Sequence, residues 1–522
     1  MTLHGFGAVC TVDALASSAG VDLLRRGGSA ADAAVAASAV LAVTTQHMCG
    51  MGGDLLAVIH PGGQHQVESL LAVGRAGSGA SADELRSEGH TAMPFRGDIR
   101  TVTVPGCVDG WLALHDRYGR LPLADVLAPA ISYAEDGFPV SPLLAAALPR
   151  VADVVGGEDL VGELPAAAGA LRRRPGLARA LRDIASDGRN GWYGGDFGRG
   201  LVELGKGWFE YDDLAHSCAD WSPPLSVEAL GWTLWGCPAP SSSYLTLAAA
   251  AVADRLDIAG REVDDPAVAH LLIEASRVVG HDRRARLHDG AQPMLDAAEL
   301  DRRAALVRPD AVSELTVPGT PGGTIFLVAV DSDGMAISFG QSNAAGFGAH
   351  IAVPEVGVFL QNRGVGFSLT PGAPDELRPG ARPPHTLAPL LATDADGELA
   401  AVLGTMGGDS QPQVLLQLLA RLRAGTAVDD ALDAPRWALA GPEGTGFDTW
   451  EGAAGGPSRQ VVRVEEDAVF ADGLRAIGHD VAVEPRGGGF GHAHLAVPHP
   501  TAPGVVAAAA EPRALTGAAA VL

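Results

Sequence analysis

One threonine in the middle of the chain stands where a nucleophile could form. Thr324 follows Gly322 and Gly323 at the end of the stretch "PGTPGG" and opens the apolar stretch "TIFLVAVD". Glycines permit strained backbone conformations, positive φ among them, beside the hydroxyl. Attack of the Thr324 hydroxyl on the Gly323 carbonyl, followed by hydrolysis of the ester, would cut the chain between the two residues. A threonine at the start of a strand is also an ordinary β-former, so two interpretations stand side by side.

Cleavage would give Thr324 a free α-amino group. The reference pKa of such a group is about 7.7 to 8.0, so near neutral pH a useful fraction can accept a proton. The amine could therefore take the proton of the hydroxyl in the same residue. Thr324 would then act as nucleophile and base together.

Gly407 and Gly408 could stabilise the oxyanion that such a nucleophile creates. They precede a helix that we expect to begin near Asp409 or Ser410, with Pro412 in its first turn and Gly425 just past its end. Free N–H groups and the positive end of a helix suit an anion, and the loss of one such donor typically costs ~10² to 10³ in rate. A pair of glycines before a helix is equally typical of a plain turn.

Other catalytic signatures are not indicated. The sequence contains no G-x-S-x-G, Walker or G-x-G-x-x-G motif. His492 and His494 would share one face of a strand, but no further metal-binding side chains stand nearby, so we expect no metal and no cofactor. Five cysteines, odd in number and without a C-x-x-C pair, indicate neither a disulfide framework nor a zinc site.

Composition and charge exclude several classes of partner. The chain has 522 residues, of which 47% are hydrophobic, and a formal charge of −25, which repels nucleic acid and anionic membranes. No apolar run reaches the ~18 residues that a membrane-spanning helix needs. The first residues show neither a basic nor an apolar segment of a secretion signal, so we expect a cytoplasmic protein.

The sequence pattern predicts the helices and strands that must position Thr324. Ser29 is expected to cap an alanine-rich helix, and a glycine turn leads into a strand at residues 55–59. Residues 324–341 are expected to form a buried hairpin, and residues 387–404 a second strand-turn-strand unit with its tip at 394–397. Buried strands with helices outside indicate a layered body.

Several long blocks of the sequence resemble the γ-glutamyltranspeptidase family, whose members cleave themselves into a large and a small subunit. Among them are "VDLLRRGGSAADAAVAASAVLAVT", "PAPSSSYLT", "TIFLVAVDSDGMAISF", "GFGAHIAVPEVGVFLQN" and "GTMGGDS". The resemblance implies an α/β fold, a four-layer αββα sandwich of the N-terminal-nucleophile hydrolase type. It also implies a large subunit of residues 1–323 and a small subunit of residues 324–522, both within one body.

The resemblance assigns roles to individual residues. Thr324 matches the nucleophile with the cut after Gly323, Gly407 and Gly408 match the oxyanion-hole glycines, and Ser342 matches a second hydroxyl that supports the nucleophile. The candidates for contact with substrate are Arg75, which matches the arginine for the α-carboxylate, together with Asn343, Arg363, His385 and Thr386.

The match fails where glutathione-cleaving members hold the glutamyl amino group. Gly366 stands in the place of their acidic residue, and His385 and Thr386 stand in the places of two adjacent serines. A charge-assisted contact is worth ~1.5 to 3 kcal/mol, so its loss would weaken glutamyl selection about ten- to a hundredfold. We therefore do not expect glutathione to be the substrate.

Three activities stay open. The first is hydrolysis or transfer of the acyl group of a small amide-type substrate through an acyl-enzyme. The second is cleavage of a carbon-carbon bond with release of an oxalyl unit in a natural-product pathway, and the third is an uncleaved binding protein. The expected partners are a small-molecule substrate and the two subunits of one precursor, with a possible homodimer of processed heterodimers.

Overall fold

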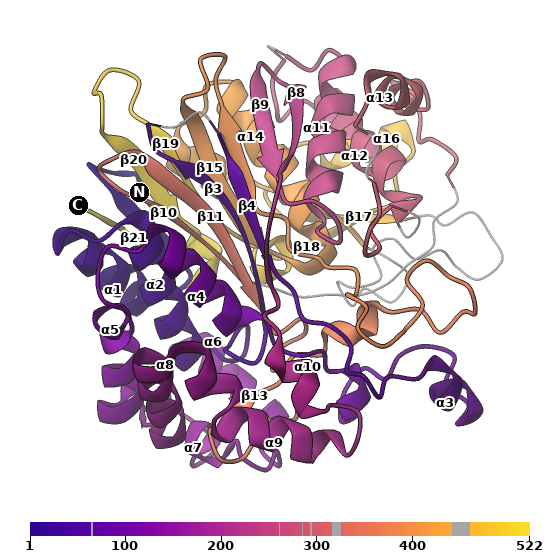
Figure 1. The fold of residues 1–522 in the computed structure, drawn as a ribbon. Coiled ribbons are helices and arrows are strands. Elements are labelled where there is room, and N and C mark those ends of the chain that lie inside the picture. The colour runs from indigo at the N-terminus through magenta and orange to yellow at the C-terminus, as the bar shows by residue number, and fades with distance from the viewer. Residues whose placement is uncertain (64–65, 260, 284–285, 293–294, 316–324, 441–459) are drawn as a thin grey trace.

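Two sheets of seven strands each pack face to face, and helices cover the outer face of each sheet (Figure 1). This computed structural model describes residues 1–63, 66–259, 261–283, 286–292, 295–315, 325–440 and 460–522. All strand pairs within the two large sheets are antiparallel. The predicted four-layer αββα sandwich is confirmed.

The first sheet contains the predicted hairpin at its centre. Its β10 and β11 pair from Ile325 opposite Gln341 to Val330 opposite Ala336. The strands in spatial order are β21 (Ala518–Val521), β2 (Ala8–Thr11), β10 (Ile325–Val330), β11 (Met335–Ser342), β3 (Asp54–Pro61), β4 (Glu68–Ala72) and β7 (Ala219–Ser222).

The second sheet contains the other predicted strand pair, β14 and β15, joined by a turn at residues 394–398. Its strands in spatial order are β1 (Leu3–Gly5), β20 (Val506–Ala510), β19 (His492–Pro498), β15 (Leu399–Met406), β14 (Leu390–Thr393), β9 (Trp232–Gly236) and β8 (Leu225–Ala229). Each sheet contains strands from residues 1–323 and from residues 324–522, and strands of the two segments pair with one another, as β2 does with β10 and β14 does with β9. The two segments therefore form one interleaved body.

Alanine-rich helices cover the first sheet. Ser29 caps α2 as predicted: its hydroxyl accepts from the N–H of Asp32, whose carboxylate accepts in return from the N–H of Ser29. Every residue of α2 is buried, and small side chains allow this helix to lie close to α1 and to the strands beneath. The helices of this layer are α1 (Ala14–Arg25), α2 (Ala30–Thr44), α4 (Cys107–Tyr118), α5 (Leu123–Asp136) and α8 (Pro175–Tyr193).

The helices on the second sheet include the one predicted after Gly408. It begins at Gln411 with Ser410 as N-cap, contains Pro412 in its first turn, and is followed by Gly425 at φ +85°. This layer comprises α11 (Ser243–Arg255), α12 (Pro266–Gly280), α14 (Gln411–Arg423) and α16 (Ala471–Ile477).

Smaller elements complete the described chain. The remaining helices are α3 (Ala82–Ser87), α6 (Pro142–Ala147), α7 (Glu158–Val161), α9 (Asp196–Gly205), α10 (Tyr211–Ala215), α13 (Ala297–Ala304) and α15 (Val428–Asp433). The short 3₁₀ helices include η1 (Ile99–Thr101), η2 (Leu148–Val151), η4 (Arg363–Gly366), η5 (Gly408–Ser410), η6 (Gly488–Phe490) and η7 (Pro512–Ala514). Minor sheets are formed by β5 (Phe138–Pro139) with β6 (Leu171–Arg172), β12 (Ala352–Val353) with β13 (Val358–Phe359), and β16 (Trp437–Ala440) with β17 (Val461–Glu465) and β18 (Val481–Glu484).

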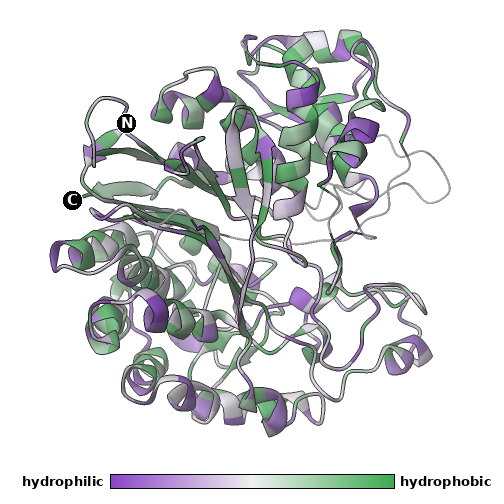
Figure 2. Cartoon of the chain, turned by 45° about the horizontal axis from the view of Figure 1, so that its top comes forward, coloured by the Kyte–Doolittle hydropathy of each residue, from purple (hydrophilic) through white to green (hydrophobic). Residues whose placement is uncertain are grey.

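Apolar side chains fill the space between the two sheets and beneath each helical layer. Between the sheets, Leu56 and Val58 of β3 lie in one cluster with Val328, Leu391 and Val402, all buried. Figure 2 shows hydrophobic residues concentrated on the strands and hydrophilic residues frequent on the outer helices. All five cysteines are buried with free thiols. None of the described helices has the length and apolar character needed to cross a bilayer.

Candidate active site

Arg363 joins two of the predicted site residues. Its Nη2 donates to the hydroxyl oxygen of Ser342 at 3.0 Å, and its Nη1 donates to the hydroxyl oxygen of Thr386 at 3.1 Å. Ser342 is the last residue of β11, Arg363 opens η4, and all three side chains are buried. The fold thus brings together three residues that are far apart in the sequence.

Burial shifts the pKa of Arg363 but leaves its side chain charged. Removal from water lowers the pKa of Arg363 to about 10, while the carboxylates of Asp54 and Asp409 act in the opposite direction. A pKa of about 10 still leaves the guanidinium cationic near neutral pH. The site therefore holds a buried positive charge that can attract a carboxylate or a polarised carbonyl.

Asp54 supports this group from the start of β3. Its Oδ1 accepts hydrogen bonds from the N–H of Gly74 at 2.9 Å, the N–H of Gly106 at 3.2 Å and Nε2 of Gln361 at 3.0 Å. Its Oδ2 lies 3.3 Å from Nε2 of His385. Four segments of the chain therefore converge on one buried carboxylate.

His385 is held by the protein at both ring nitrogens. Its Nδ1 accepts from the N–H of Leu387 at 3.2 Å, so Nε2 carries the proton and donates to Asp54. Burial, with help from the charge of Arg363, lowers the pKa of His385 to about 4 against the opposing effect of Asp54. The neutral ring shapes the wall beside Thr386, and its contact with substrate stays a prediction.

Gly407 and Gly408 occupy the turn from β15 into η5 and α14. Their φ angles are +147° and +59°, and a Cβ on Gly407 would lie 2.4 Å from the hydroxyl oxygen of Ser410. The carbonyl of Gly407 accepts from that hydroxyl at 2.7 Å and from the N–H of Ser410 at 3.0 Å. Within the described part of the chain, neither N–H of the two glycines donates to another residue. The geometry suits the predicted anion-binding role.

Asn343 lies against the glycine turn that precedes β3. The side chain is fully buried, and neither amide atom has a hydrogen-bond partner among the residues that the structure describes. A Cβ at Gly50 would come within 3.2 Å of its Nδ2, and a Cβ at Gly53 within 2.6 Å of its Oδ1. The glycine turn predicted before this strand is confirmed, and Asn343 has polar atoms that no described residue binds.

Arg75 lies in a separate ionic cluster at the edge of this region. Its Nη1 donates to the carbonyl of Gly380 at 3.1 Å, and its guanidinium lies 3.8 Å from Asp220 and 3.9 Å from Asp289. Asp220 also pairs with Arg382. Arg75 is 43% exposed. The residue before it, Gly74, donates its N–H to Asp54. The ionic cluster of Arg75 therefore lies next to the buried group around Arg363 but is not part of it.

Gly366 is enclosed at the point where the sequence lacks an acidic side chain. A Cβ there would lie 2.8 Å from the carbonyl oxygen of Pro384. Any side chain would require the backbone to shift. The local packing therefore leaves no room for the acidic side chain that would bind a glutamyl amino group.

Two predicted residues, Gly323 and Thr324, lie outside the described residues.

Four residues of the site went unrecognised in the sequence, namely Asp54, Gln361, Arg283 and Asp409. Arg283 and Asp409 form a buried ion pair with a closest approach of 3.2 Å, and their charges act on the pKa of Arg363. The only available signal was the position of Asp54 directly after the turn "GMGG" and of Asp409 directly after Gly408.

His492 and His494 lie on β19 and are buried, as the strand pattern implied. No third ligand atom gathers around them among the residues that the structure describes. Burial lowers the pKa of His492 to about 4 and that of His494 to about 3.

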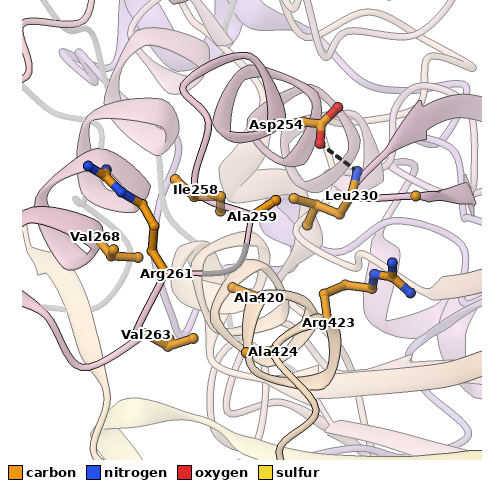
Figure 3. A pocket seen from close by; sticks show the side chains of 11 residues that line it. Leu230, Asp254, Ile258, Ala259, Arg261, Val263, Val268, Ala420, Arg423 and Ala424 are labelled. Carbon is orange, nitrogen blue, oxygen red and sulfur yellow. Dashed lines mark hydrogen bonds between the residues drawn. The ribbon is translucent and has the colours of Figure 1, made fainter.

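A hollow of about 270 Å³ lies elsewhere, between α11, α12 and α14 (Figure 3). Leu230 and Ile258 line it with Ala420, and Asp254 on its rim accepts from the N–H of Leu230 at 3.1 Å. None of the predicted site residues lines this hollow. It is therefore a feature separate from the active-site group.

Comparison with known proteins agrees with this geometry. The family description "Gamma-glutamyltranspeptidase" matches residues 16–521. The oxamate amidohydrolase proenzyme of Klebsiella pneumoniae is 35% identical, over 97% of this chain and 96% of the relative. The Acylase ACY 1 proenzyme of a Pseudomonas species is 30% identical, over 92% and 88%.

A solved structure extends the likeness to three dimensions. The cephalosporin acylase from Bacillus halodurans superposes with a TM-score of 0.88 at 30% identity, over 100% of this chain and 97% of that one. The match spans both sheets and both helical layers. The chain is thus an enzyme that belongs to the γ-glutamyltranspeptidase family.

Proposed function

We propose that this enzyme cleaves itself after Gly323 and then hydrolyses small amides through Thr324, with an acyl group that carries a carboxylate or a second carbonyl. The observation that carries the proposal is the bridge from Arg363 to Ser342 and Thr386 at the end of β11. Ile325 of β10 pairs with Gln341. In the sequence, Thr324 directly precedes Ile325 and Ser342 directly follows Gln341.

Maturation would proceed in two balanced steps. The hydroxyl of Thr324 adds to the carbonyl of Gly323, the C–N bond breaks, and the nitrogen takes up a proton to become the free α-amine. Water then hydrolyses the ester, leaving a carboxylate on Gly323 and the hydroxyl on Thr324. Residues 1–323 and 324–522 stay associated, because both sheets contain strands of both segments hydrogen-bonded to one another.

Turnover would use the same hydroxyl. The α-amine of Thr324 accepts the proton of the hydroxyl as its oxygen attacks the substrate carbonyl. The N–H groups of Gly407 and Gly408 stabilise the oxyanion. The leaving amine departs with the proton, and water releases the acid from the acyl-enzyme. Ser342, fixed by the N–H of Ala344 at 2.9 Å as well as by Arg363, supports the nucleophile.

The charges of the site favour an anionic or strongly polarised acyl group. Arg363 supplies a buried cation, and Arg75 supplies a second cation at the edge. Asn343 supplies amide atoms that have no partner among the described residues. Gly366 offers no acid for a glutamyl amino group. These features support a short oxalyl-type acyl group over a γ-glutamyl group. The cytoplasmic location and the homodimer stay predictions.

The test uses the purified full chain, a denaturing gel and intact-mass measurement. Two fragments are expected, one ending at Gly323 and one beginning at Thr324. The Thr324→Ala variant is expected to stay intact, while Thr320→Ala in the same stretch serves as the matched control and cleaves normally. A wild-type chain that stays intact on incubation would contradict self-cleavage.

Substrate class is tested on the cleaved enzyme. Ammonia release from oxamate is measured beside anilide release from a γ-glutamyl anilide. Turnover of oxamate with little release from the anilide is the expected result, and rapid release from the anilide would contradict the argument from Gly366. Cleavage of a carbon-carbon bond in a 2-oxo acid, with neither amide hydrolysed, would replace the reaction proposed here. Binding without turnover of any of these would identify a binding protein.

A further inference from the structure

His270, Glu274 and His479 form a buried cluster apart from the active site. Their ligand atoms all lie within 4.8 Å of one another, and no other group of three metal-binding side chains gathers in the described residues. His270 and Glu274 stand one turn apart on α12, and His479 follows the end of α16. We propose that these three side chains bind a divalent transition-metal ion, with Zn²⁺ as the ion that the imidazole and carboxylate ligands suit.

His270 is oriented as a metal ligand would be. Its Nε2 lies 2.7 Å from the carbonyl oxygen of Arg308, and a carbonyl can only accept, so Nε2 carries the proton. Its Nδ1 therefore presents a lone pair toward Nε2 of His479, 2.8 Å away. A hydrogen bond from the outer nitrogen to a backbone carbonyl is a common support for a metal-bound histidine.

Glu274 is fixed by two further contacts. One carboxylate oxygen accepts from Nη1 of Arg277 at 2.5 Å, and the other accepts from the N–H of Ser313 at 2.8 Å. Each oxygen has a second lone pair, so one remains for a cation. The positive charge of Arg277 opposes the cation, whereas two neutral imidazoles and one carboxylate attract it. The arrangement favours a softer, nitrogen-binding ion over Ca²⁺ or Mg²⁺.

The ion would replace the proton that the two imidazoles share. Zn–N bonds are about 2.0 to 2.1 Å, so two nitrogens on a tetrahedral ion stand about 3.4 Å apart. The rings of His270 and His479 therefore need to separate by about half an ångström. On binding, the proton of His479 moves from Nε2 to Nδ1, so the ring stays neutral and Nε2 offers its lone pair to the ion. Three protein ligands leave one position for water.

The site would tie three separate segments together. The ligands come from α12 and from His479, just after α16. Arg308 and Ser313, which support His270 and Glu274, belong to the stretch that follows α13. This stretch is the last described part of the segment that ends at Gly323. The ion would anchor the carboxyl-terminal end of the large subunit, a consequence that rests on the proposed cleavage, whereas the binding site itself does not.

The test is equilibrium binding of Zn²⁺ to the full chain after chelator treatment and desalting, with the bound metal measured by mass spectrometry. About one equivalent per chain is expected, with a rise in melting temperature and, for Co²⁺, visible bands of a tetrahedral site. The His270→Gln and His479→Gln variants are expected to bind at least tenfold more weakly. His281→Gln, at the end of the same helix, is the matched control and keeps the wild-type affinity.

Two outcomes would overturn the proposal. One is a wild-type chain that binds no equivalent of Zn²⁺. The other is equal binding by the wild type and by the folded double variant of His270 and His479, with folding checked by circular dichroism. The Thr324→Ala variant is expected to bind Zn²⁺ like the wild type. A failure of self-cleavage would therefore not count against the metal site, and the two proposals can fail separately.

Discussion

His385 donates a hydrogen bond to Asp54 across 3.3 Å, and neither side chain is exposed to solvent. The pair links the start of β3 to the segment that carries Thr386, whose hydroxyl accepts from Arg363. The neutral histidine and the carboxylate therefore fix the wall of the site without placing a second cation beside Arg363.

The first prediction concerns the stability of this pair with pH. Burial lowers the pKa of His385 to about 4, from an ordinary value of 6.5. Between these values the unfolded chain binds the extra proton, so stability falls as the pH drops from 6.5 toward 4. The His385→Gln variant keeps a donor for Asp54 but does not titrate. Its free energy of unfolding is expected to fall less steeply than that of the wild type. The two slopes should differ by up to about 1.4 kcal/mol per pH unit.

Urea unfolding at several pH values between 4 and 6.5 measures this difference. The exposed His216→Gln is the control, and its profile is expected to match the wild type. Identical slopes for His385→Gln and the wild type would contradict a neutral buried His385.

The second prediction concerns Arg363. A lysine keeps the charge but cannot reach both hydroxyls, so the Arg363→Lys variant loses at least one charge-assisted contact. We expect kcat/KM for the substrate that the turnover assays identify to fall about ten- to a hundredfold. Arg86→Lys, at a partly exposed arginine that pairs with Glu376 away from the site, is the matched control and changes little. Unchanged kcat/KM in Arg363→Lys would show that the bridge is dispensable.

The third prediction concerns Gly366. An acid placed there by Gly366→Asp is expected not to restore γ-glutamyl turnover, because its Cβ would lie 2.8 Å from the carbonyl of Pro384. The variant should melt at a lower temperature, while Gly487→Asp, where a Cβ meets nothing within 4 Å, should melt close to the wild type. A stable Gly366→Asp variant with γ-glutamyl activity would refute this explanation of specificity.

The fourth prediction concerns Gly407. Gly407→Ala would place a Cβ 2.4 Å from the hydroxyl of Ser410 and would disturb the N–H groups of the turn. We expect turnover to fall ~10² to 10³-fold, the effect of losing one oxyanion donor. Gly425→Ala, also at positive φ but facing open space, is the control for backbone strain alone. Equal losses in the two variants would assign the effect to strain.

Much of the fold was predictable because it depends on local patterns. The cap at Ser29, the hairpin of β10 and β11, and the helix between Ser410 and Gly425 all follow from neighbouring residues. The order of strands in the two sheets was not readable from periodicity. Pairing such as that of β10 with β2 depends on contacts between residues hundreds of positions apart.

In the candidate site, too, some features were predictable from the sequence and others were not. Ser342, Arg363, His385 and Thr386 were named from the sequence, but their mutual contacts and the role of Asp54 were not. Nothing near Asp54 in the sequence indicates that four distant segments donate to it. The cluster of His270, Glu274 and His479 was missed for the same reason, since no local metal motif contains all three.

By itself the sequence determined the layered αββα fold, the family and the absence of an acid at Gly366, because these depend on residue types and on patterns along the chain. Only the tertiary structure decided that Arg363 is a buried cation between two hydroxyls, and that Arg75 lies in a different ionic cluster. The physical reason is that charge, burial and hydrogen-bond partners depend on which distant segments exclude water from the same place.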